Sequence, residues 1–336
     1  MTRSRLAPGT GIVTVPGGAP VLRTSGGEFL RIDTGGVTGE DLVRRLAGEG
    51  TAEDETPGEE APGEGAHAAE LARLVEAFEA AGHALSTPPR APLAGRTVHL
   101  LGDPVLTAPV ARCAGAEGAE VHRITPDGVA ELARAAPDGG AEGRVAVVWC
   151  LDSPVPDGLW DTADRLPGRR IAWLRCHREG AHSWIEPLAA APGDVTSRHI
   201  RLRRLAATPA HRELAAYWAG HRTPDTGPHP TEASAALIAA LLTADLIAWA
   251  EAEAEAEAEA EAEAEAGAGA GEVAGVGAGT SRAAAVLPVR RRLRRIDLRD
   301  LTLTEHPVLP VPDVAPLPAP AAVRTRAGAG AAEARP

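Results

Sequence analysis

The chain has 336 residues, enough for two modest domains with cores of their own, and a formal net charge of −12 at pH 7. This acidic balance argues against binding to duplex nucleic acid, whose phosphates attract basic surfaces. All 34 basic residues are arginines, and the sequence contains no lysine, asparagine or glutamine.

The three cysteines, Cys113, Cys150 and Cys176, follow no Cys-x-x-Cys spacing. The lack of such a spacing argues against an ordinary zinc site and against a disulfide framework. Residues 1–20 contain no continuous apolar run of the signal-peptide type, and no segment reaches 18 uncharged apolar residues. We therefore expect a cytoplasmic protein that does not bind a membrane.

The N-terminal residues 1–87 predict a small α+β domain. Short apolar runs separated by glycine-containing turns predict strands at 12–15, 21–24 and 29–33. The acidic, proline-containing segment 49–65 has no apolar face to bury, so it is expected to be a loop.

Two helices should follow these strands. The hydroxyl of Thr38 can cap the first helix. The second is expected over 67–81, where Leu71, Leu74 and Phe78 recur at helical spacing. Three strands followed by two helices favour a winged-helix-like module.

After Pro88 and Pro89 the pattern changes to alternating strands and helices. Residues 93–249 are therefore predicted to form a Rossmann-type α/β domain with a parallel sheet covered by helices. Strands are expected at 97–101, 120–124, 145–151 and 171–176, and helices near 105–115, 127–136, 211–218 and 231–249.

Two arginine-rich segments, 198–204 and 290–295, alternate basic with apolar residues. As strands they would direct a charged face outward, either to solvent or to an acidic peptide or protein partner. The sequence leaves both interpretations open.

Eight Glu-Ala repeats at 251–266 lead into a stretch rich in glycine and alanine. Glutamate and alanine favour helix, but no lysine offsets the repulsion among the glutamates. Residues 250–282 are predicted to be a low-complexity insertion that peptide binding does not need. Residues 283–315 would complete the α/β domain, and 316–336 would form a disordered Pro/Ala tail.

The first strand of the α/β domain leads into Gly102, where a nucleotide-binding loop would lie. Such loops need several glycines and free N–H groups close to the phosphates. Here Asp103 would repel phosphate and Pro104 removes a donor. We therefore predict no bound cofactor.

Three polar residues of this domain could suggest catalysis or metal binding. Cys176 and His177 are adjacent in a strand, so they point to opposite faces and make a poor pair for either task. We predict a core cysteine beside a surface histidine. Asp152 ends a strand, where α/β enzymes place metal or ribose ligands, but no phosphate loop accompanies it. The sequence therefore predicts neither a catalytic residue nor a metal site.

Several stretches resemble a known family; they are 20–24, 27–33, 41–46, 71–82, 93–102 and 290–310. They are similar to the leader-peptide-binding partner proteins of azoline-forming peptide biosynthesis, which work with YcaO-family cyclodehydratases in pathways to thiazole/oxazole-modified peptides and thiopeptides. The resemblance implies an N-terminal domain that recognises precursor peptides and a degenerate ubiquitin-activating-like α/β domain. The chain lacks the glycine-rich ATP loop and the four-cysteine zinc site of active ubiquitin-activating proteins, so a non-catalytic partner subunit is implied.

The leader peptide is expected to bind as an added strand. Strand 29–33 would receive it, because three short strands leave an unpaired edge, and the helix over 70–81 would wall the groove. Arg31 and Arg73 would favour an acidic leader. The predicted contact residues are Phe29, Leu30, Arg31, Ile32, Asp33, Glu70, Arg73, Leu74, Ala77 and Phe78. The alternative, that Phe29, Leu74 and Phe78 form the domain core, stays open.

Two other functions are considered. An ATP-dependent adenylating enzyme of the ubiquitin-activating type is disfavoured by residues 102–104. A winged-helix transcription regulator is disfavoured by the acidic segment 49–64. The expected partners are the precursor peptide and the cyclodehydratase, without nucleic acid, and the sequence leaves a homodimer open.

Overall fold

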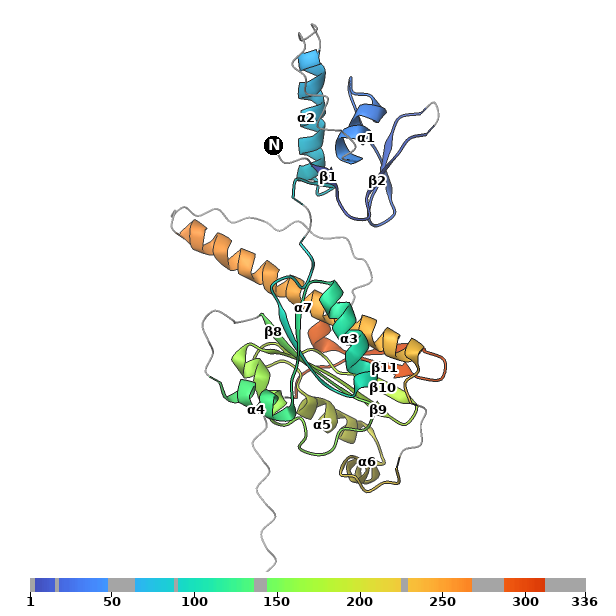
Figure 1. Cartoon of the computed structure of the whole chain (residues 1–336), viewed down its shortest axis with the longest axis vertical. Helices are drawn as coiled ribbons and strands as arrows, with labels where there is room; N and C mark the ends of the chain where they lie inside the picture. Colours follow the sequence, from blue (N-terminus) through green and yellow to red (C-terminus); the bar gives the residue numbers. More distant parts are fainter. Residues whose placement is uncertain are drawn as a thin grey trace, which may run out of the picture. The chain divides into compact units, whose positions relative to one another are not determined.

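The computed structural model describes residues 4–15, 18–47, 64–87, 90–135, 144–224, 229–267 and 287–311. The chain divides into two compact units, residues 1–91 and 92–336 (Figure 1). The predicted acidic loop 49–65 lies largely outside the described residues, and the predicted tail 316–336 lies wholly outside them.

The first unit contains a three-stranded antiparallel sheet in the order β2-β3-β4 and a two-stranded sheet of β1 and β5. Its elements are β1 (Arg5–Leu6), β2 (Gly11–Val13), β3 (Val21–Arg23), β4 (Phe29–Arg31), α1 (Gly39–Ala47), α2 (Glu64–Ala80) and β5 (Ala84–Leu85). The three predicted strands and two predicted helices are thus confirmed to within a few residues.

Local signals explain the ends of both helices. The hydroxyl of Thr38 accepts a hydrogen bond from the N–H of Asp41 at 3.1 Å, which caps α1. Gly82 follows α2 with φ = +72°, a left-handed conformation that favours glycine. The small core of this unit is made of Leu22, Val37, Leu42, Leu46, Val75, Phe78 and Ala84.

The second unit is built on a seven-stranded sheet in the order β12-β11-β10-β9-β8-β6-β7. The strands are β6 (Thr97–Gly102), β7 (Glu120–Arg123), β8 (Val145–Leu151), β9 (Ala172–Glu179), β10 (His182–Ile185), β11 (Arg292–Asp297) and β12 (Leu303–Pro307). Only β7, β6, β8 and β9 are parallel, while β9 to β12 pair antiparallel. The four strands predicted for this domain are parallel as expected, whereas the sheet as a whole is mixed, because the short turn at Gly180 (φ = +57°) folds β10 back onto β9.

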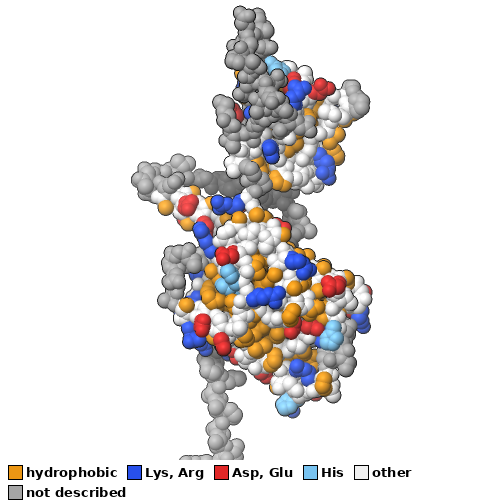
Figure 2. Space-filling view, viewed as in Figure 1, with side chains coloured by type: hydrophobic (Ala, Val, Ile, Leu, Met, Phe, Trp, Pro, Cys, Tyr) orange, Lys and Arg blue, Asp and Glu red, His pale blue; other side chains and the backbone are white. Residues whose placement is uncertain are grey.

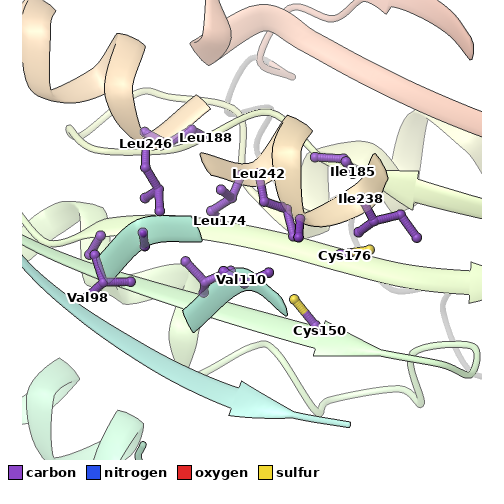
Figure 3. Packing of buried hydrophobic residues seen from close by; sticks show 14 of the residues in the cluster. Val98, Val110, Cys150, Leu174, Cys176, Ile185, Leu188, Ile238, Leu242 and Leu246 are labelled. Atoms are coloured by element: carbon purple, nitrogen blue, oxygen red, sulfur yellow. The ribbon is translucent and has the colours of Figure 1, made fainter. Parts of the chain in front are cut away.

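Helices cover both faces of this sheet. They are α3 (Pro104–Ala116), α4 (Pro126–Arg134), the short 3-10 helix η1 (Ala163–Arg169), α5 (Ser197–Ala207), α6 (His211–Trp218), α7 (Glu232–Gly267) and η2 (Val289–Arg291). α3 and α7 share a core with one sheet face, and Figure 3 shows Leu242 and Leu246 of α7 directed toward Leu174 and Val98 of the strands. A second core on the other face joins α4 and η1 to Trp149.

The long helix α7 spans residues 249–250, where the predicted α/β domain meets the predicted low-complexity insertion. The helix runs without a break from its buried apolar part into the Glu-Ala repeats. Glu253 pairs with Arg290 at 2.6 Å and Glu257 with Arg144 at 3.9 Å, so the first repeats are tied to the folded unit. α7 is also long and apolar enough to cross a membrane, since an 18-residue stretch of it has a mean hydropathy of 1.8. Its apolar residues Leu242 and Trp249, however, lie fully in the core, as expected for the central helix of a folded domain.

The arginine-rich segment 198–204 is helix α5 and not a strand, so that prediction was wrong. The carboxylate of Asp164 caps the N-terminus of this helix by accepting hydrogen bonds from the N–H groups of Ser197 and Arg198, at 3.0 and 2.9 Å. A capping box between Thr196 and His199 adds to this start.

The other arginine-rich segment, 290–295, forms η2 and most of β11, but its basic residues do not all face outward. Arg294 is buried and pairs with Asp245 of α7 at 2.5 Å, and Arg292 pairs with the same carboxylate at 2.7 Å. The sequence pattern could not show this, because the partner carboxylate lies about 50 residues away.

The prediction of a surface histidine at His177 was also wrong. Alternate residues of β9 form a buried polar row, in which Arg175 pairs with Glu186 at 2.9 Å and His177 lies 3.3 Å from Glu179. Burial raises the pKa of Glu186. Cys176, on the opposite side of the strand, lies in the apolar core as predicted.

We expect a deletion of residues 259–280 to leave the thermal unfolding midpoint unchanged, because it spares the contacts of Glu253 and Glu257. A deletion of 251–280 should lower the midpoint by a few degrees, since a partly buried ion pair contributes on the order of 1 kcal/mol. Calorimetry of both variants checks this. Equal midpoints would show that the first repeats contribute no stability.

Candidate functional site

The outer strand of the small sheet, β4, presents free backbone groups. The N–H of Thr24 donates to the carbonyl of Glu28 at 2.8 Å, and that of Ile32 donates to Pro20 at 3.3 Å. Because hydrogen-bonded pairs alternate in an antiparallel ladder, Leu30 is bonded to Leu22 of β3. The N–H and C=O groups of Phe29 and Arg31 therefore point away from the sheet.

The side chains on this strand are exposed as well. Phe29 has 62% of its surface exposed and Leu30 has 43%. Figure 2 shows hydrophobic and basic side chains together on the surface of this unit. Leu30 is on the same face of the sheet as the buried Leu22, because the two residues are direct cross-strand partners. An added strand would therefore meet an apolar strip and a row of backbone donors and acceptors.

The remaining predicted contact residues divide between surface and core. Ile32 is half-buried, and the carboxylate of Asp33 accepts from the N–H of Gly35 at 3.2 Å, within the turn after β4. The carboxylate of Glu70 on α2 accepts from the N–H of Gly36 at 3.1 Å, so α2 is fastened to this turn.

Further along α2, the predicted residues point in two directions. Arg73 and Ala77 are exposed, whereas Leu74 is half-buried against the core and Phe78 is only 7% exposed. Of the three residues that could have been core residues, Phe78 and Leu74 are, while Phe29 is not. The surface left for a peptide is therefore centred on β4 and not on the apolar side of α2.

Other sheet edges among the described strands are less receptive. β12 directs the backbone of Leu303, Glu305 and Pro307 outward, and Pro307 has no N–H. β7 carries exposed charged residues, Glu120 and Arg123. Charges and proline are the usual means by which proteins protect sheet edges from pairing. β4 has no proline, and Arg31 is its single charged residue, beside the exposed Phe29 and Leu30.

In the second unit, Gly102 ends β6 where a phosphate loop would begin, but its role is structural. Its φ is +114°, and a Cβ atom there would lie 1.8 Å from the carbonyl oxygen of Cys150 on β8. Glycine is therefore required by the close approach of two strands. The N–H of Asp103 donates to the same carbonyl at 2.9 Å.

The space beyond these strands is occupied by carboxylates. Asp103 accepts from the N–H of Asp152 at 2.6 Å. Asp152 in turn binds Arg178 and lies 2.8 Å from Nδ1 of His229. Two carboxylates and the proline at the start of α3 leave no organised set of N–H donors for phosphate here. Within the described residues, no group of three His, Cys, Asp or Glu side chains is placed to hold a metal ion.

The fold is similar to that of solved heterocyclases. A heterocyclase in complex with substrate and cofactor matches with a TM-score of 0.58 and 12% identity, over 91% of this chain and 38% of that chain. The heterocyclase TruD matches with a TM-score of 0.56 and 13% identity, over 92% of this chain and 42% of that chain. This chain thus spans about two fifths of the length of the heterocyclases it matches.

Other comparisons add no family assignment. A chain of the E. coli microcin synthetase McbBCD complex has a TM-score of only 0.41, which is too low to establish a shared fold. No family model matches the sequence, and no curated protein matches it. The comparisons therefore establish a heterocyclase-like mixed α/β fold.

We predict that Gly102→Ala destabilises the protein by more than about 3 kcal/mol, because it combines a left-handed backbone with a clash against Cys150. The control Gly115→Ala, in α3 with open space around it, should change stability by less than about 1 kcal/mol. Urea denaturation measures both. Similar effects of the two substitutions would contradict this role for Gly102.

We also predict that the protein does not bind Mg-ATP tightly, because Asp103 and Asp152 lie where phosphates would bind. Isothermal titration calorimetry checks this. A micromolar dissociation constant, equivalent to about −8 kcal/mol, would require an organised phosphate site and would contradict the prediction.

Proposed function

We propose that this chain binds the leader region of a ribosomally synthesised precursor peptide at the free edge of β4 and presents it to a YcaO-family cyclodehydratase that forms thiazoline or oxazoline rings, in the cytoplasm. The observation that carries the proposal is the outward-facing backbone of Phe29 and Arg31 beside exposed apolar side chains. An extended peptide added to a sheet edge gains affinity from main-chain hydrogen bonds and selectivity from side-chain contacts.

The partner role is supported by the heterocyclase-like fold together with the carboxylates at the potential nucleotide site. Nearly all of this chain is covered, but only about two fifths of each heterocyclase chain is. The carboxylates at Asp103 and Asp152 support a non-catalytic chain and weigh against the alternative of an adenylating enzyme.

The charge of the site favours an acidic leader peptide. Arg31 on β4 and Arg73 on α2 are both exposed, and Arg23 of β3 lies across from Phe29. Opposite charges would speed the encounter and fix the orientation of the peptide more than they would add affinity.

We expect Arg31→Pro to lower leader affinity at least about tenfold, equivalent to about 1.4 kcal/mol, because proline removes an outward N–H and obstructs the edge. The fold should survive, since edge strands tolerate proline where the N–H faces solvent. Fluorescence polarisation with a labelled leader measures the affinity, and circular dichroism checks the fold.

Arg31→Ala is the matched control, because it removes the same charge and keeps the N–H. It should weaken binding much less than Arg31→Pro does. Equal losses in the two variants would assign the effect to the charge of Arg31 alone. Unchanged binding by Arg31→Pro would show that the peptide docks elsewhere.

A further inference from the structure

The two faces of the small sheet differ in chemistry, and both faces reach the free edge at β4. Direct cross-strand partners lie on the same face of a sheet, so the register assigns each side chain of β4 to one face. Leu30 lies with Leu22 on the face that packs against the core. Phe29 and Arg31 lie on the opposite, outer face. A strand added beside β4 would place its residues on these two faces alternately.

On the core side, a row of apolar side chains ends open at β4. Ile12, Leu22 and Leu30 are direct cross-strand neighbours on β2, β3 and β4. Leu22 in the middle of the row is only 3% exposed, whereas Leu30 at its end keeps 43% of its surface exposed. An apolar side chain opposite Leu30 would continue the row and cover this leucine. Because Leu30 bonds to Leu22, it would form a non-hydrogen-bonded pair with the added residue, and in such pairs the side chains lie closest together.

On the outer face, Phe29 presents an aromatic ring to the neighbouring strand position. The ring lies at the edge of the sheet with 62% of the side chain exposed. Aromatic side chains pair favourably across strands with aromatic or β-branched residues. The added residue opposite Phe29 is therefore expected to be large and apolar, and its backbone would bond to the outward N–H and C=O groups of Phe29.

Arg31 determines the second outer position. Its side chain is exposed, and its partner across the sheet is the half-buried Val21, so no carboxylate faces it from β3. A carboxylate on the added residue opposite Arg31 would form a cross-strand pair of opposite charges. The expected residue at this position is therefore aspartate or glutamate.

Acidic residues on both sides of β4 restrict this preference to one position. Glu28 directly precedes the strand, and Asp33 follows it within two residues of Arg31. The carboxylate of Asp33 is partly engaged, since it accepts from the N–H of Gly35 at 3.2 Å, while Glu28 is exposed. Like charges directly opposite each other destabilise a strand pair. The edge should therefore select an acidic residue at one place and not an acidic peptide in general.

We propose that the β4 edge selects peptides by three consecutive residues: an acidic residue opposite Arg31, a large apolar residue opposite Leu30 and a second large apolar residue opposite Phe29. This inference rests on the proposed function and specifies which leader peptides the edge accepts. The order is that of an antiparallel strand read from its N-terminus, which continues the antiparallel pairing of β2, β3 and β4.

The test selects short random peptides displayed on phage for binding to the full chain. The wild-type chain should enrich the three-residue pattern. Arg31→Glu should change only the first position, from acidic to basic. Two synthetic peptides that carry glutamate or arginine there should differ about tenfold in affinity by fluorescence polarisation, in opposite directions for the two chains, because a repelling pair replaces an attracting one.

Two further variants complete the test. Leu30→Asp should change only the second position, from apolar to basic, and circular dichroism checks that the partly exposed site tolerates it. Arg5→Glu is the matched control, because Arg5 is likewise an exposed arginine on a strand of the same unit, β1. It changes the net charge as Arg31→Glu does and should leave the enriched pattern unchanged. A shift of the same size in Arg5→Glu would overturn the pattern, since net charge would then explain it.

The outcomes separate this inference from the proposed function. If the enriched peptides lose binding to Arg31→Pro but Arg31→Glu keeps the acidic preference, the peptide pairs with β4 and only the pattern is wrong. If the enriched peptides bind Arg31→Pro as tightly as the wild-type chain, or if no peptide is enriched, the edge receives no strand. The proposed function then fails together with the pattern.

Discussion

Backbone hydrogen bonding at the edge of a short sheet is the constraint on which this account depends. A three-stranded sheet has two edges, and β4 directs the N–H and C=O groups of Phe29 and Arg31 outward. The opposite edge strand, β2, directs only those of Ile12 outward, because Gly11 and Val13 bond to β3. Exposed Phe29 and Leu30 accompany the single charge of Arg31 at the β4 edge, whereas several charges and a proline occupy the edges of the large sheet. One edge is thus suited to receive a strand.

In the large α/β unit, carboxylate side chains occupy the place where a nucleotide ligand could bind. At the carboxyl ends of β6 and β8, where related architectures bind nucleotides, Asp103 and Asp152 bond to the backbone and to Arg178. The glycine at the end of β6 lets this strand pass close to β8. The site beside it, however, offers no organised set of N–H donors for a phosphate. Its exposed large hydrophobic side chains, among the described residues, are Val105 on α3, Leu202 on α5, Leu303 on β12 and Leu309 after β12. The filled ligand site supports the proposal that this unit takes no part in nucleotide chemistry.

Much of the fold could be predicted where the signal is local, as with the Thr38 cap and the glycine at the end of α2. The predictions that were wrong concern residues whose contacts lie far away in the sequence. The N-terminus of helix α5 is capped by Asp164, which lies 33 residues before the N–H group that it binds. The alternation of basic and apolar residues in this segment, taken alone, had suggested a strand. His177 is buried because Glu179 and Glu186 surround it once β10 folds back. The candidate strand at 29–33 could be predicted, but the exposure of Phe29 and the burial of Phe78 follow from pairing and packing, which the pattern does not contain.

Amide exchange of the full chain, measured residue by residue with and without leader peptide, tests the central claim most directly. If the peptide adds to β4, the outward N–H groups of Phe29 and Arg31 gain protection, while that of Leu30, already bonded to Leu22, changes little. This alternation is specific to strand addition. Binding that protects α5 or β12 and leaves Phe29 and Arg31 exchanging as before would contradict the account.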